Sequence, residues 1–239
     1  MPTEAQLIAL LTGADTAWTT ARGVTRHWRN HTLVFRAFHQ HFDRMRAAGD
    51  TVWSVSFTAV GEPTDDPILE TVRAIAVDRP HRRRRAELLS WRGGEMRPDL
   101  IVIDGDAFWA RTGSELLTNH GDPNFSHGGT EFAALLQPSA VPDQFALSIN
   151  GREHLVAGHT CASVSDSRRR DVARAKPGGR LDPFGMIARG DDFALYVDLD
   201  IGVLLRVVKL VEGQSAEVCE FTELILDEVL PDGLFAPLR

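Results

Sequence analysis

The side chains most able to do chemistry in this chain of 239 residues are nine histidines. His27 and His31 lie four positions apart, and His39 and His41 lie two apart. A spacing of two on a strand puts both rings on one face, as some metal sites require. No acidic or cysteine residue lies nearby at a spacing that would complete such a site. Packed or solvated histidines are therefore favoured, and we expect no metal.

The sequence also lacks the motifs that hold common cofactors. The glycine-rich stretch GDPNFSHGG at 121–129 is followed by neither a lysine nor a long helix, so it does not match a phosphate-binding loop. No nucleophile elbow and no dinucleotide fingerprint is present. We therefore expect no cofactor.

Large apolar side chains recur along the expected strands and on one expected helix. Core packing accounts for such side chains, but they could equally line a ligand cavity, and the two interpretations are compatible. The residues expected to contact a ligand are Trp28, Phe38, Trp53, Phe57, Trp109, Phe132, Leu136 and Phe145. Tyr196 and His39 are the catalytic candidates, and Trp109 is a further polar contact, because a polar atom among apolar neighbours is costly unless it is paired or used.

The elements that must position these residues are mostly strands. From Phe193 onward, alternating apolar residues separated by turns at 200–202 and 212–214 predict a three-strand antiparallel meander. Asp104-Gly105-Asp106 predicts a hairpin within 100–110, and further strands are expected at 51–60, 70–79, 145–149 and 154–164. The charged segment 165–183 is typical of a loop.

Two helices are expected, and one segment is ambiguous. Apolar spacing predicts a helix over 4–11, capped by Thr3 and ended by Gly13, and a second helix that begins at Thr130. Residues 31–48 fit a helical period, but part of the segment also alternates. We prefer one long strand from Val24 to His41.

Composition limits the class of protein. A formal net charge of −7 argues against a nucleic-acid partner, and the run Arg82 to Arg85 continues a strand pattern in which half of the arginines should point outward and the others pair with carboxylates. No apolar run is long enough to insert in a membrane. The start of the sequence lacks the pattern of a signal peptide, and Cys161 and Cys219 are expected to be reduced core thiols, which favours a cytoplasmic location.

Four segments together resemble the family of the lipoprotein carrier LolA: VRAIAVDRPHRRRRAEL at 72–88, LIVIDGDAFWAR at 100–111, YVDLDIGVLLRVVKL at 196–210 and FTELILDEVLPDGLFAP at 221–237. The resemblance implies one α+β domain over 1–239, in which helices cover the concave face of a curved antiparallel half-barrel sheet. It also implies an apolar cavity between sheet and helices, where the carriers hold acyl chains. Without an export signal, we expect a cytoplasmic relative of actinobacterial type rather than a carrier between membranes.

The expected partner is therefore a hydrophobic small molecule. A cavity that folds a flexible substrate into one conformer can catalyse without a cofactor, so the leading hypothesis is a cyclase of polyketide or other secondary-metabolite biosynthesis, acting by pericyclic or conformational catalysis. The alternative is a non-catalytic carrier or sensor of lipids or lipoprotein acyl chains, and a third hypothesis is a scaffold that binds a partner protein. The sequence does not determine the oligomeric state or choose among these hypotheses.

Overall fold

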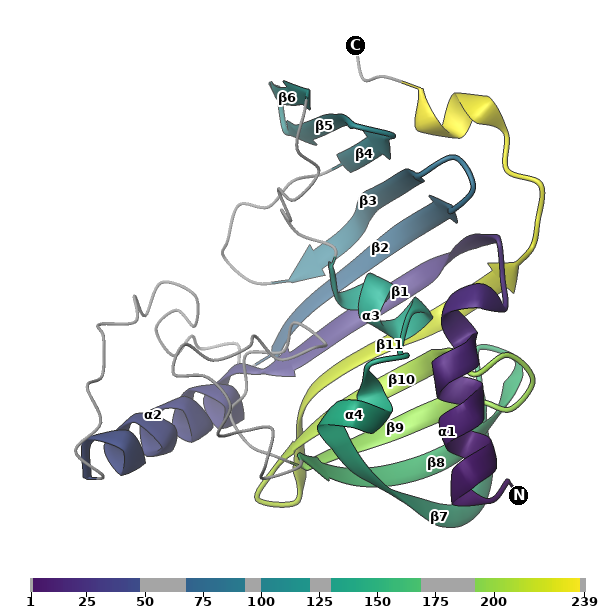
Figure 1. The fold of residues 1–239 in the computed structure, drawn as a ribbon. Helices are drawn as coiled ribbons and strands as arrows, with labels where there is room; N and C mark the ends of the chain where they lie inside the picture. The colour runs from purple at the N-terminus through teal and green to yellow at the C-terminus, as the bar shows by residue number, and fades with distance from the viewer. Residues whose placement is uncertain (1, 48–67, 93–99, 121–129, 169–191, 237–239) are drawn as a thin grey trace.

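A computed structural model describes residues 2–47, 68–92, 100–120, 130–168 and 192–236 (Figure 1). Eleven strands form one sheet in the order β6-β5-β4-β3-β2-β1-β11-β10-β9-β8-β7. The strands are β1 (Thr20–Asn30), β2 (Ile68–Asp78), β3 (Arg83–Arg92), β4 (Leu100–Asp104), β5 (Ala107–Thr112), β6 (Glu115–His120), β7 (Phe145–Val156), β8 (His159–Arg168), β9 (Asp192–Asp198), β10 (Leu204–Val211) and β11 (Gln214–Leu226).

The sheet is antiparallel, curved and unclosed, which confirms the predicted half-barrel. The first and last strands along the chain, β1 and β11, pair with each other near its centre, and each continues into one arm of the sheet. The predicted meander is β9, β10 and β11, and the predicted Asp-Gly hairpin is β4 and β5. Strand β10 is buried along most of its length, as expected for a strand that is packed on both faces.

Helices lie over the concave side of the β7–β11 arm (Figure 1). They are α1 (Glu4–Gly13), α3 (Thr130–Leu136) and the short α4 (Val141–Gln144). Helix α1 begins as predicted: the Thr3 hydroxyl accepts a hydrogen bond from the Gln6 backbone N–H, and the Gln6 side-chain oxygen accepts one from the Thr3 backbone N–H. Leu7 and Leu11 of α1 are fully buried in the main apolar core.

The long strand expected from Val24 to His41 is wrong. Strand β1 ends at Asn30, and α2 (His31–Ala47) follows at once. The Asn30 side chain accepts a hydrogen bond from the Leu33 backbone, which satisfies one of the free N–H groups at the start of the helix. Leu33, Val34, Ala37 and Phe38 then pack as one helical face against Val211 and Ala216. The 3.6-residue period therefore prevails over the alternation. The strand expected at 51–60 and most of the charged segment 165–183 lie outside the described residues.

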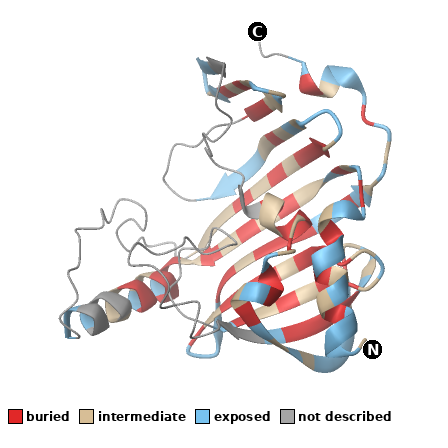
Figure 2. Ribbon diagram, in the orientation of Figure 1, coloured by how far each residue is buried: buried red, intermediate tan, exposed pale blue. Residues whose placement is uncertain are grey.

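Strand register separates the two faces of the sheet. Paired residues of neighbouring strands point to the same side, so the series Ile75–Ala86–Ile101–Ala110 lies on the concave face and Ala76–Arg85–Val102–Trp109 on the outer face. Figure 2 shows the resulting alternation of buried and less buried residues along the strands. The outer face carries a second cover, the 3-10 turn η3 (Asp232–Phe235).

Glycine at position 202 is required by the contact between α1 and the β9–β10 turn. Gly202 has a φ of +85°, and a Cβ there would lie 2.2 Å from the Leu10 carbonyl oxygen. Gly213 has a similar φ of +74°, but nothing lies within 4 Å of its Cβ position. The backbone strain of an alanine is thus common to both sites, and the clash with α1 is specific to Gly202.

We predict that G202A lowers the free energy of unfolding by about 2 kcal/mol more than G213A, because only the first forces α1 away from the sheet. Urea denaturation of both variants measures the difference. Equal losses would show that the close approach of α1 to Gly202 does not contribute to stability.

Candidate functional site

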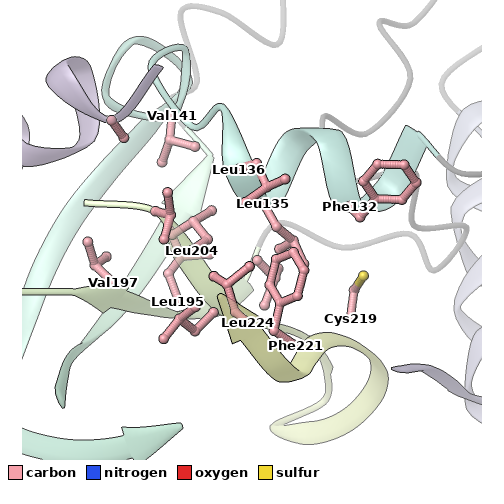
Figure 3. Packing of buried hydrophobic residues seen from close by; sticks show 14 of the residues in the cluster. Phe132, Leu135, Leu136, Val141, Leu195, Val197, Leu204, Cys219, Phe221 and Leu224 are labelled. Atoms are coloured by element: carbon pink, nitrogen blue, oxygen red, sulfur yellow. The ribbon is translucent and has the colours of Figure 1, made fainter. Parts of the chain in front are cut away.

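The concave face of the β7–β11 arm is filled by the protein's own side chains. Phe132, Leu135 and Leu136 of α3 point down onto the sheet, where they meet side chains of β9, β10 and β11 (Figure 3). Leu135 and Leu136 are almost completely buried. This arm is a packed core that anchors the helices.

The concave face of the other arm has a different composition. Its apolar side chains alternate between small and large, and form what we call the concave strip: Ile75, Ala86, Ile101, Ile103, Phe108 and Ala110. The helices α1, α3 and α4 contact β7, β10 and β11 instead. All side chains of the strip except Ile103 are buried. Ile75 and Ala86 belong to the helix-covered core, and Ile101, Phe108 and Ala110 form a cluster of their own.

A row of charged residues borders the concave face at the end nearest α2. Glu217 of β11 pairs in register with Arg29 of β1 and with Lys209 of β10. The Glu217 carboxylate is fully buried and accepts a hydrogen bond of 2.7 Å from Arg29 Nε, while the Lys209 ammonium lies 3.7 Å from the centre of the Phe193 ring. This charged row ends the apolar part of the concave face and fixes the register of three central strands.

Three of the predicted ligand-contacting residues lie together in the main core. Phe132 and Leu136 are on the sheet-facing side of α3, and Phe145, at the start of β7, packs edge-to-face on Phe193 with ring centres 5.2 Å apart. The structure therefore brings these residues to the concave side. There they contact other protein side chains.

Other predicted residues lie elsewhere. Trp28 and Trp109 are on the outer face, where Trp109 packs against the cluster that includes Leu230 and Phe235. Phe38 is on α2, in the cluster around Val211 and Ala216. A pattern in the sequence predicts which side chains share one face of a strand or helix. It does not show which face of the sheet is concave. Trp53 and Phe57 lie outside the described residues.

The two catalytic candidates are on different elements. Tyr196 of β9 lies on the outer face, with its ring 5.2 Å from the Arg206 guanidinium and 5.2 Å from the His154 ring. His39 is on α2, with its ring 4.3 Å from that of Phe35. In Figure 1, α2 projects away from the sheet, so these positions do not define one catalytic centre.

A cysteine, a histidine and an aspartate come close at one end of the sheet. His159 Nδ1 lies 2.7 Å from Asp198 Oδ2, and Asp198 Oδ1 accepts hydrogen bonds from the backbone of Asp200 and Ile201. Burial, together with the charge of Asp198, raises the pKa of the Cys161 thiol to about 12. The thiol is therefore protonated at neutral pH and donates weakly to the His159 carbonyl. The Asp198 carboxylate holds the β9–β10 turn through the backbone of Asp200 and Ile201.

A separate groove of about 700 Å³ lies on the outer side of α1. It is bordered by α1, the residues that follow it and the β9–β10 turn, including Leu10, Leu199 and Ile201. None of the predicted site residues lines it. Within the described residues, no three His, Cys, Asp or Glu side chains come together as a metal site would need, and none of the helices is long and apolar enough to span a membrane.

Several solved structures are similar to this chain at low sequence identity. MucB matches with a TM-score of 0.50 and 15% identity over 98% of this chain and 62% of the MucB chain. Lipoprotein LppX of Mycobacterium tuberculosis matches with a TM-score of 0.49 and 10% identity, over 96% of this chain and all of LppX. LolA superfamily protein NE2245 of Nitrosomonas europaea has a TM-score of 0.33 and 10% identity, over 96% of each chain.

The chain spans less than two thirds of the length of MucB. No family model and no curated protein is similar to it. The match to MucB is one of fold alone. The curved, unclosed antiparallel sheet of this chain is the fold that the resemblance of the four sequence segments implies.

The concave strip was not among the residues predicted to contact a ligand. Its alternation is visible in the sequence, in VRAIAV at 72–77 and LIVI at 100–103. What the sequence does not show is that Ile75, Ile101 and Ala110 lie side by side, because strand pairing brings them together.

We predict that E217Q lowers the free energy of unfolding by about 3 kcal/mol, because it leaves the buried Arg29 guanidinium without its carboxylate. The matched control is E223Q, an exposed position on the same strand, which should change stability by less than about 0.5 kcal/mol. Chemical denaturation of both variants is the measurement. Similar values for the two would mean that the charged row does not hold the central strands.

Proposed function

We propose that this protein binds a hydrophobic small molecule on the concave side of its half-barrel, at the concave strip. The observation that carries the proposal is the apolar surface formed by β2 to β5 beside the helix-covered core. Ile101, Phe108 and Ala110 of this strip are buried in the structure, so a ligand reaches them only if the side chains that cover them move. The fold resemblance supports a ligand on the concave side of the sheet, because it implies an apolar cavity between the sheet and its helices.

Burial of an apolar ligand supplies the driving force. Apolar surface removed from water contributes about 25 cal/mol per Å², so 300 Å² of ligand surface gives roughly 7 kcal/mol. Part of this is lost to the entropy of association. The binding free energy that remains corresponds to a reversible complex. Such a complex suits a protein that carries, senses or presents its ligand.

A cyclase would add a chemical step to the same binding. Tyr196 lies on the outer face and His39 on α2, so neither supports that step from where it lies. We therefore propose binding and assign no reaction, and the cyclase stays a prediction. Native mass spectrometry separates the two: co-purified lipid supports a carrier or sensor, and turnover of a linear polyene supports the cyclase.

The cytoplasmic location also stays a proposal. It is supported by Cys161 and Cys219, which are both buried and not linked by a disulfide. Fractionation of the source cells, followed by detection of the protein in each fraction, tests this location directly. Recovery outside the cytoplasm would overturn it.

We predict that A110M weakens the binding of oleyl alcohol at least tenfold, because the larger side chain fills the concave strip that the ligand would occupy. Displacement of Nile red by the alcohol measures this affinity. Ala110 is buried, so the larger side chain should also lower the free energy of unfolding by about 1–3 kcal/mol.

The matched control is A76M, on the outer face of the adjoining sheet region. Ala76 is packed with Leu100, Val102 and Phe235, so a methionine there should lower stability by about 1–3 kcal/mol and leave binding intact. Binding of oleyl alcohol that is as tight in A110M as in A76M and wild type would show that the concave strip is packed core and not a binding site.

A further inference from the structure

The sheet has two edge strands, β6 and β7, and β7 is protected against pairing with another chain. An edge strand presents backbone N–H and C=O groups that a further strand can bind. In β7 the pairing with β8 shifts register between Ile149 and Glu153, the exposed residues Arg152 and Glu153 are charged, and α1 contacts the strand. A bulge, charged side chains and a covering helix are all devices that prevent edge-to-edge pairing.

Strand β6, at the opposite end of the sheet, lacks this protection (Figure 1). It pairs with β5 residue for residue over Glu115–His120, without a shift in register. Its sequence, ELLTNH, contains no lysine, arginine or proline. All four side chains at 115–118 are exposed, and Leu116 and Leu117 expose 43% and 58% of their surface. Among the described residues, no strand pairs with the outer edge of β6.

The two exposed leucines lie on opposite faces of the sheet. Leu117 pairs in register with Ala110, so it points to the concave face, and Leu116 pairs with Arg111, so it points to the outer face. A strand added to the edge of β6 would contact both leucines. Its backbone hydrogen bonds would therefore form together with burial of apolar surface on both faces.

We propose that β6 pairs antiparallel with the β6 strand of a second copy of this chain, about a two-fold axis, so that one sheet continues through a dimer. An interface of this symmetry must be complementary to itself. With the axis at Leu117, this leucine lies opposite its own counterpart, Leu116 lies opposite Thr118, and Glu115 lies opposite Asn119. Glu115 is the only acidic residue of the strand, so no like charges face each other in this register.

The size of the contact sets the strength and the extent of the association. A strand of six residues is about 20 Å long, and a stable dimer buries about 800 Å² on each partner. One strand edge with two leucines supplies less, so we expect a reversible dimer with a Kd of about 10–100 μM. Association should stop at two chains, because the pairing uses both β6 edges and leaves only the protected β7 edges. This dimer does not depend on the proposed ligand.

Sedimentation velocity of the full chain, from about 2 to 500 μM, tests the proposal. Wild type should change reversibly from monomer to dimer over this range. L117K should weaken the dimer at least tenfold, because it removes the apolar contact and sets two ammonium groups opposite each other. L155K is the matched control: Leu155 is 75% exposed on the other edge strand, β7, and the same change there should leave the dimer as in wild type.

Wild type that is still monomeric at the highest concentration would overturn the proposal, as would an L117K variant that dimerises as wild type does. Weakening by L155K to the same extent, or growth beyond a dimer, would also contradict two-fold pairing of β6. If L117K does not fold, L117C decides the question. Opposed residues of an antiparallel pair lie at a Cα separation that suits a disulfide, so mild oxidation should link two copies of L117C and not of L155C. Both native cysteines are buried. Absence of the link in L117C would overturn the proposal.

Discussion

The pairing of β1 with β11 is the interaction on which the rest of the structure depends. It joins residues some 200 positions apart, such as Ala21 and Leu226, and makes one sheet from the two arms. Its register shifts between Val24 and Thr25, and a Cβ at Gly23 would lie 2.2 Å from the Glu223 carbonyl oxygen. A bulge at this point bends the strands and strengthens their twist, which favours a curved sheet over a flat one. Without this long-range pair, neither a concave face nor a boundary between the two arms would exist.

The two arms of the curved sheet are covered on different faces. On the β7–β11 arm, α1, α3 and α4 cover the concave face and fill it with leucine and phenylalanine side chains. On the other arm, the short 3-10 turn near the C-terminus covers the outer face, through Leu230, Phe235 and the ion pair of Arg83 with Asp232. The outer cover stabilises β3 to β5 on one face, and the buried residues of the concave strip stabilise them on the other.

Local patterns in the sequence predicted local structure well. The Asp-Gly hairpin, the meander and the helix capped by Thr3 depend on residues close in the chain, and all three are confirmed. The segment at 31–47 was predicted wrongly because its apolar residues fit two periods, and packing of Val34 and Phe38 on distant strands decided between them. The candidate site depended still more on distant contacts. Trp109 and Tyr196 have the residue types of a binding site, but strand pairing places both on the outer face.

We propose that an apolar ligand lies along the concave strip. Photo-crosslinking with a fatty acid that carries a diazirine along its chain tests it most directly, because peptide mass spectrometry locates each crosslink. We expect crosslinks to β2, β3, β4 and β5 at concave positions such as Ile101 and Phe108. Crosslinks confined to the outer-face residues around Trp109, or to the groove beside α1, would contradict the claim.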